Sequence, residues 1–173
     1  PTALHPLLTT GNQLPMRFLN DATAFAVGEA WVGQGRGFRK VVVITLGTGF
    51  GSAFVDDGVP VVAREDVPPE GCLWHLPFKD GIADAYFSTG WFVQAYENRT
   101  GRKVEGVKTL MDQPTGDVVA QQLFSEFGHN LASCLAPWLK SFGAEMLVIG
   151  GNIGHALPLF ESQLRQSLHQ EGV

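Results

Sequence analysis

The chain of 173 residues is 45% hydrophobic and 17% charged, which suits one globular domain whose core is stable without disulfides or a metal. A formal net charge of -5, without any block of Lys or Arg, argues against an extended surface for nucleic acid or anionic lipid. Cys72 and Cys134 form neither a metal set nor a disulfide framework, and no apolar run could span a bilayer, so we expect a cytoplasmic protein with a small ligand.

The first predicted elements lie around the pair Asn20-Asp21. We expect a loop over residues 1–13, a short strand over 16–19 and a helix over 22–31 that the following glycines end. Asp21 therefore stands at a strand-to-helix junction. A carboxylate there can cap the helix by accepting from the free N–H groups of its first turn, or it can face a ligand. This stretch alone leaves both interpretations open.

The clearest stretch is KVVVITLGTGFGSAFVDDGVPVVA, residues 40–63. It contains a β-branched run, a glycine-rich break, a second apolar run, an Asp-Gly turn and a third apolar run. We expect these three runs to form an antiparallel meander.

The rest of the chain predicts a loop over 64–81 and a helix over 84–99. A long amphipathic helix that ends near residue 142 is expected next, capped by Thr115 or Asp117 and kinked at Pro137. EMLVIGGN is predicted as a buried strand that leads into a glycine turn, and residues 155–170 as a final helix. A meander followed by strands that alternate with helices indicates an α/β layered domain.

Two glycine turns follow apolar strands and are candidate ligand sites. LGTGFG, residues 46–51, can present backbone N–H groups to an anion, or it can be a tight hairpin whose glycines only allow positive φ. No Gly-Lys-Ser/Thr follows, which excludes a Walker loop, and the strand after it makes a dinucleotide fingerprint a poor fit. VIGGN, residues 148–152, lies where open α/β sheets bind ligands, although it can also be a simple connector.

These motifs together resemble the carboxyl-terminal lobe of the ROK family (repressors, open reading frames and sugar kinases). The segments that carry the resemblance are, in order, FLNDATAFAVGEA, VVVITLGTGFGSAFVDDG, a loop with His75, DAYFSTG and LVIGGN. The resemblance implies an actin-like ATPase (ribonuclease-H-like) α/β fold, with an antiparallel meander in a mixed sheet flanked by helices. Residues 1–173 would then form a single domain, the large lobe of a two-lobed protein. The function implied for that protein is ATP-dependent phosphorylation of a hexose or amino-hexose. The alternative is a sugar-sensing transcriptional regulator without catalysis.

The resemblance also implies roles for individual residues. Asp21 matches the catalytic base that takes the proton from a sugar hydroxyl, and Asn20 matches a residue that holds a neighbouring hydroxyl. The first glycine turn matches a phosphate motif and the second an adenosine motif, so ATP with Mg²⁺ is the expected cofactor. The residues expected to bind the nucleotide are Gly47, Thr48, Gly49, Gly51, Gly150, Gly151 and Asn152.

The sugar-binding segment departs from the family pattern. The family's Gly-Glu-X-Gly-His aligns with GCLWH, which keeps His75 but has Cys72 in place of a sugar-binding Glu and Trp74 in place of a Gly. A thiol cannot replace a carboxylate that accepts from two hydroxyls, so the sugar or its affinity must differ. Glu70 would stand in if the loop is shifted. Asp84 falls where the family has another sugar-binding Glu, or it caps the helix that follows.

The resemblance further sets expectations about metals and partners. The family's zinc-binding cysteines should follow His75, but LPFKDGIAD contains no Cys, so we expect neither a structural zinc nor another metal ligand. The family's first phosphate motif belongs to an amino-terminal lobe that this sequence lacks, so the chain alone should turn over little or nothing. Sugar and ATP are the expected ligands, with no nucleic acid bound through this domain and no membrane. Family members commonly form dimers through this lobe, so a homodimer is expected.

Overall fold

The fold is a mixed four-stranded sheet with helices on both faces. The computed structural model describes residues 19–112 and 117–173. The predicted loop over 1–13, most of the predicted strand over 16–19 and the alternative cap Thr115 lie outside the described residues. The strand order is β3 (Val59–Val61), β2 (Phe50–Asp56), β1 (Lys40–Leu46) and β6 (Met146–Gly150). The first three strands pair antiparallel and β6 pairs parallel to β1, which confirms the meander in a mixed sheet.

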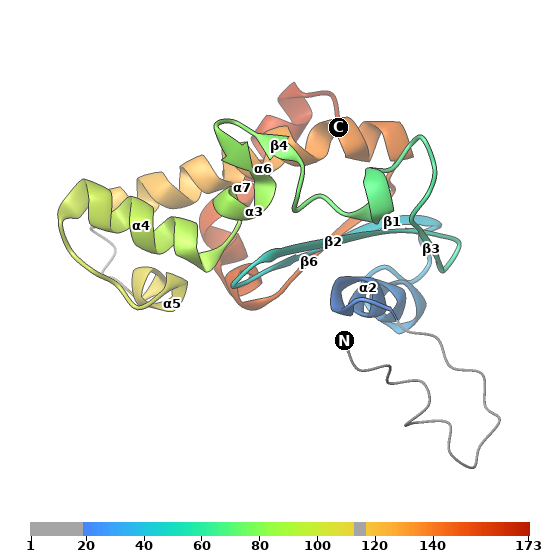
Figure 1. Ribbon diagram of the computed structural model, residues 1–173, viewed down its shortest axis with the longest axis horizontal. Coiled ribbons are helices and arrows are strands. Elements are labelled where there is room, and N and C mark those ends of the chain that lie inside the picture. The colour runs from blue at the N-terminus through green and yellow to red at the C-terminus, as the bar shows by residue number, and fades with distance from the viewer. Residues whose placement is uncertain (1–18, 113–116) are drawn as a thin grey trace, which may run out of the picture.

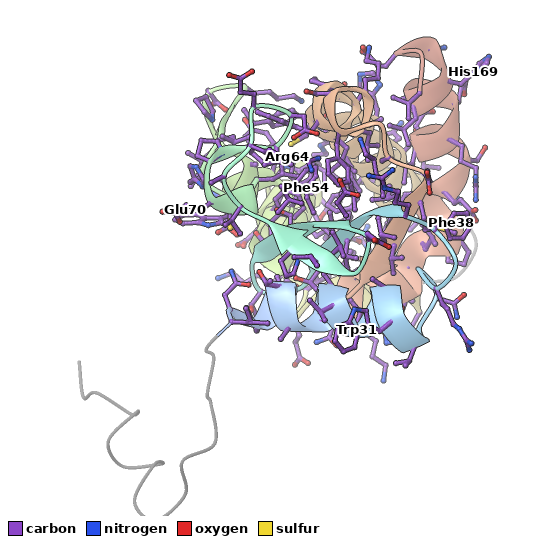
Figure 2. The ribbon with its side chains drawn as sticks, turned by 90° about the vertical axis from the view of Figure 1, so that its right-hand side faces the viewer. Trp31, Phe38, Phe54, Arg64, Glu70 and His169 are labelled. Atoms are coloured by element: carbon purple, nitrogen blue, oxygen red, sulfur yellow. The ribbon has the colours of Figure 1, made fainter. Side chains whose placement is uncertain are left out.

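Side-chain alternation along the strands builds a separate core on each face of the sheet, because successive residues of a strand point to opposite faces. Val41 and Val43 of β1 pack with Ala26 of α2 (Asp21–Val32). Val42 and Ile44 belong to the larger core on the other face, where the long helices lie. Figures 1 and 2 show α2 below the sheet, with Trp31 on it and Phe54 beyond the sheet.

The larger core is built on α6 (Val118–Phe142) and α7 (Leu157–Gln170). The Asp117 carboxylate caps α6 by accepting from the backbone N–H of Ala120 at 3.0 Å, as one of the two predicted caps. Pro137 lies within α6 without ending it. The two helices approach closely at Gly128, where an added Cβ would come within 2.7 Å of the Phe160 carbonyl oxygen. Phe92, Phe124 and Phe127 are buried in this core, and Trp91 and Trp138 pack against it.

The single helix predicted over 84–99 is wrong. The structure has α3 (Ala83–Tyr86) and α4 (Thr89–Thr100), separated by two residues of which Ser88 is fully extended. Burial explains the break, because Phe87 is completely buried and its ring contacts those of Phe50 and Phe127. In a continuous helix, the Phe87 side chain would point in another direction.

Three further differences from the predicted elements are local. The predicted loop over 64–81 contains η1 (Pro69–Gly71) and a hairpin of β4 (Pro77–Phe78) and β5 (Gly81–Ile82). A short helix, α5 (Val107–Met111), was not predicted. The final helix begins at Leu157 rather than 155, because the 3₁₀-helix η2 (Asn152–Ala156) precedes it.

Candidate functional site

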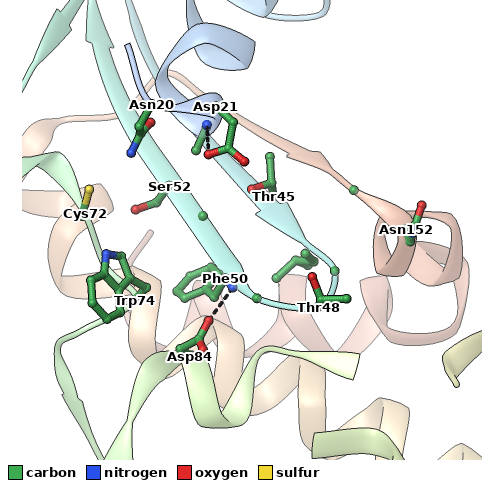
Figure 3. A pocket seen from close by; sticks show the side chains of 16 residues that line it. Asn20, Asp21, Thr45, Thr48, Phe50, Ser52, Cys72, Trp74, Asp84 and Asn152 are labelled. Atoms are coloured by element: carbon green, nitrogen blue, oxygen red, sulfur yellow. Dashed lines mark hydrogen bonds between the residues drawn. The ribbon is translucent and has the colours of Figure 1, made fainter. Parts of the chain in front are cut away.

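A cavity of about 520 Å³ opens where α2 begins, beside the turn between β1 and β2 (Figure 3). Loop residues after η1 and the start of α3 close its other sides. Ten of the predicted site residues line it: Asn20, Asp21, Gly47, Thr48, Gly49, Gly51, Cys72, Asp84, Gly151 and Asn152. Glu70, His75 and Gly150 are not among the lining residues. The Glu70 side chain projects from the outer edge of the molecule (Figure 2).

The structure distinguishes the two candidate roles of Asp21, because the neighbouring residue Asn20 caps the helix. Asn20 is the N-cap of α2, and its side-chain oxygen accepts from the backbone N–H of Thr23 at 2.7 Å. Asp21 is the first residue of the helix, and one of its oxygens accepts from the Ala22 N–H at 2.9 Å. Because Asn20 caps the helix, the exposed carboxylate of Asp21 is left at the cavity, beside Thr45 (Figure 3).

The first glycine turn is held at both ends and open at its apex. The Gly47 carbonyl accepts from the backbone N–H of Thr89 at 2.7 Å and from its hydroxyl at 3.0 Å. At the other end, the Phe50 N–H donates to Asp84 Oδ1 at 2.6 Å. The exposed apex consists of Thr48 and Gly49, whose backbone N–H groups have no partner among the described residues. Free amides in a concave turn can bind an anion.

Both glycines of the second glycine turn are closely packed, so a Cβ would clash at either position. A Cβ on Gly150 would come within 2.6 Å of the Phe25 ring of α2. Gly151 has φ +85, and a Cβ there would come within 2.7 Å of the Leu46 backbone nitrogen. Gly151 and Asn152 reach the cavity, whereas nucleotide binding by Gly150 stays a prediction.

The wall opposite Asp21 is formed by Cys72 and Trp74. Burial, with a smaller effect of the Glu70 charge and an opposing hydrogen bond from Asn20, raises the pKa of the Cys72 thiol above its usual 9.0. The thiol is therefore neutral at pH 7. Trp74 lines the cavity with 48% of its surface exposed, so its indole is available to a ligand.

Ser52 was missed by the sequence analysis although it positions this wall. Its buried hydroxyl accepts from the Leu73 N–H at 2.8 Å and donates to the Gly71 carbonyl at 3.4 Å. The loop on either side of Cys72 is thus fastened to β2. The sequence contained a signal for this role. Ser52 lies between Phe50 and Phe54 on the core-facing side of a strand, and a buried hydroxyl there needs a polar partner.

A second cavity of about 560 Å³ adjoins the first, and Asn152 lines both. Its walls come from α5, η2 and the start of α4, and its lining is formed by Thr89, Gly106, Val107, Lys108, Met111, Asp112, Asn152, Ile153 and His155. This cavity was not predicted from the sequence, because its wall α5 was not predicted. Thr89 lines the cavity and also binds the first glycine turn.

Across residues 19–112 and 117–173, no three His, Cys, Asp or Glu side chains gather as a metal site would require. In the same residues, no helix combines the length and apolar character needed to cross a membrane.

Comparisons with known proteins identify relatives of most of the chain. The family model described as "ROK family" matches residues 2–171. The N-acetyl-D-glucosamine kinase of Pectobacterium carotovorum is 28% identical across an alignment that covers 83% of this chain and 53% of that protein. The glucokinase of Thermotoga maritima is 28% identical across an alignment that covers 86% of this chain and 54% of that protein. The chain thus spans about half the length of these curated relatives.

Solved structures show the same fold. A glucokinase from Parabacteroides distasonis matches with a TM-score of 0.83 and 24% identity, over 97% of this chain and 53% of that one. A ROK family transcriptional regulator, a homologue of the E. coli MLC protein, matches with a TM-score of 0.77 and 21% identity, over 97% of this chain and 47% of that one. The predicted actin-like ATPase fold is confirmed by such neighbours.

Proposed function

Because the chain belongs to the ROK family, we propose that the protein it forms part of is an ATP-dependent sugar kinase. The substrate would be a hexose or an amino-hexose. Two relatives with 28% identity, an N-acetyl-D-glucosamine kinase and a glucokinase, support this proposal.

One observation carries the proposal: an exposed carboxylate and an open glycine turn share one cavity. Asp21 would take the proton of a sugar hydroxyl while that oxygen bonds to the γ-phosphorus, and the bond from the γ-phosphorus to the bridging oxygen of ADP breaks. A positioned general base contributes about 10²- to 10⁴-fold to such a step. Phosphoryl transfer otherwise depends on positioning and charge stabilisation, which the free amides of Thr48 and Gly49 support.

The nucleotide would extend from the first cavity into the second. Its phosphates would lie at the glycine turn, and Asn152 would mark the passage, since it lines both cavities. Val107, Met111 and Ile153 give the second cavity apolar walls that suit a planar base. Mg²⁺ bound with the nucleotide would neutralise phosphate charge.

The sugar would lie between Asp21 and the wall of Cys72 and Trp74. The Asn20 side chain uses its oxygen for the cap of α2, so its amide group would serve a hydroxyl as donor. A neutral thiol binds hydroxyls weakly, whereas the exposed indole of Trp74 can stack on the apolar face of a pyranose. Specificity should therefore depend more on ring shape at this wall than on charge.

The test is turnover of the whole protein in a coupled assay across a panel of hexoses and amino-hexoses. Asp21→Asn should lower the turnover rate by about 10²-fold or more, because the amide cannot accept the proton. Asp57→Asn is the matched control, since Asp57 lies in the β2–β3 turn with φ 51, which Asn tolerates, and it does not line the first cavity. Equal turnover by Asp21→Asn and the unaltered protein would contradict the assignment of the base.

A sugar-sensing transcriptional regulator is the second candidate. The observation that favours it is the cavity wall, where Cys72 and Trp74 replace the Glu and Gly that the family pattern places there. A ROK regulator also has this fold. Sugar binding in calorimetry, without turnover of ATP, would favour this candidate over the kinase.

A further inference from the structure

The first glycine turn cannot fix its own shape. Three of the six residues in LGTGFG are glycines, and glycine loses more conformational freedom on folding than any other residue. Within the turn, the Gly47 N–H donates to the Gly49 carbonyl at 3.1 Å. The β1–β2 ladder closes the base of the turn by pairing Leu46 with Phe50. The side-chain anchors come from α3 and α4, which lie more than thirty residues later in the chain.

Asp84 links this turn to the sugar-facing wall. Its carboxylate accepts from the Phe50 N–H at 2.6 Å, and its own backbone N–H donates to the Trp74 carbonyl at 2.9 Å. The carboxylate is not used to cap α3, whose N-cap is Ile82 and has no side-chain cap hydrogen bond. One residue therefore holds both loops that face the cavity. A hydrogen bond to an ionised acceptor is also stronger than one between neutral groups.

Thr89 holds the other end of the turn through two hydrogen bonds to the Gly47 carbonyl. The break between α3 and α4 makes this possible. As the first residue of α4, Thr89 has a backbone N–H that no earlier helical turn uses. In a continuous helix, that N–H would donate four residues back instead of to Gly47.

We propose that Asp84 and Thr89 are positioning residues for the phosphate turn, rather than ligands of the sugar. Together they hold Gly47 and Phe50 so that the N–H groups of Thr48 and Gly49 stay directed at an anion. This inference rests on the proposed function only in naming the anion as the phosphates of a nucleotide. It departs from the role in sugar binding that the family resemblance implies for Asp84.

The test compares variants that differ in one hydrogen bond. Asp84→Asn and Asp84→Ala both remove the charge, but only Asn keeps an oxygen for the Phe50 N–H. Thr89→Ser keeps the hydroxyl, whereas Thr89→Val removes it at similar volume. Calorimetry measures the binding of the magnesium complex of AMPPNP, and separately of D-glucose and N-acetyl-D-glucosamine.

We expect Asp84→Ala to bind AMPPNP about tenfold more weakly than Asp84→Asn, and Thr89→Val to bind it a few-fold (roughly 3-fold) more weakly than Thr89→Ser. Sugar affinity should stay within about twofold in all four variants, because the proposal gives neither side chain a sugar contact. Weaker sugar binding by both Asp84 variants, with unchanged binding of AMPPNP, would overturn the inference and leave the proposed kinase intact.

Hydrogen exchange tests the anchor without any ligand. The Phe50 amide should exchange at least about tenfold faster in Asp84→Ala than in Asp84→Asn, because its acceptor is lost. If the unaltered protein bound no AMPPNP, the proposed function would fail, and this measurement would still decide on the anchor. Equal exchange of the Phe50 amide in the two variants would refute the positioning role.

Discussion

Replacing Asn20 with Ala should destabilise the protein, although Asn20 is exposed and lies at the edge of the cavity. At the start of α2, the Thr23 N–H donates to the Asn20 side-chain oxygen at 2.7 Å. Loss of such a cap costs about 1 kcal/mol of the free energy of unfolding. For a chain of 173 residues this lowers the melting temperature by about 2–4 °C.

The neighbouring carboxylate should behave differently. Asp21→Asn keeps an oxygen for the Ala22 N–H and loses only the interaction of a charge with the helix dipole, about 0.3–1 kcal/mol at low salt. Salt screens this interaction at the exposed helix end. In high salt, Asp21→Asn should therefore unfold close to the unaltered protein, while Asn20→Ala stays destabilised.

Urea unfolding in low and high salt measures both effects, with Asn20→Asp as the control that retains a capping oxygen. The reasoning fails if Asp21→Asn is as destabilising as Asn20→Ala in high salt, because Asp21 would then hold the helix end. It fails equally if Asn20→Ala and Asn20→Asp have the same stability.

Three further predictions concern the core, a helix and pH. Phe127→Ala should lower the free energy of unfolding by about 3–5 kcal/mol in urea denaturation, because its fully buried ring contacts the rings of several aromatic residues. As a control, Val32→Ala at an 83% exposed position should change this free energy by no more than about 0.5 kcal/mol. Gly28→Ala should raise the free energy of unfolding by about 0.5–1 kcal/mol, because Gly28 lies within α2 and a Cβ added there would meet no atom within 4 Å. A decrease in the free energy of unfolding would contradict this. Hydrogen bonds from Tyr96 and the Ala120 N–H hold the pKa of Asp117 below its usual 3.8, so its stabilising effect should be complete above that pH and fade as pH falls through the lowered pKa. Urea titrations at a series of pH values should show the gap between the unaltered protein and Asp117→Asn narrowing in acid, and a constant gap would refute this.

Local patterns predicted most of the sheet. The meander follows from β-branched runs separated by turn residues, and β6 from an apolar run before two glycines. The long helix α6 follows from its amphipathic period and its Asp117 cap. Each of these signals is contained within a short window, which is why the sequence alone carries them.

The break between α3 and α4 could not be predicted in the same way. It depends on Phe87 entering a ring cluster and on Thr89 binding Gly47, 42 residues away in the chain. For the site, the glycine motifs and Asn20-Asp21 predicted most of the lining. The contributions of Ser52 and Thr89 depend on loops that meet only in the folded chain.

Strand β2 places tight limits on how this molecule can vary in length. Gly51 and Ala53 face α2, while Phe50 and Phe54 enter the opposite core and Ser52 fastens the loop of Cys72. A one-residue shift in the pairing of β2 with β1 would exchange the two faces of the strand, and the length of the turn between Leu46 and Phe50 helps to fix that pairing. Homologous chains should therefore keep the length of this connection constant and vary their ligand preference through substitutions, or through insertions in the longer segment after β3.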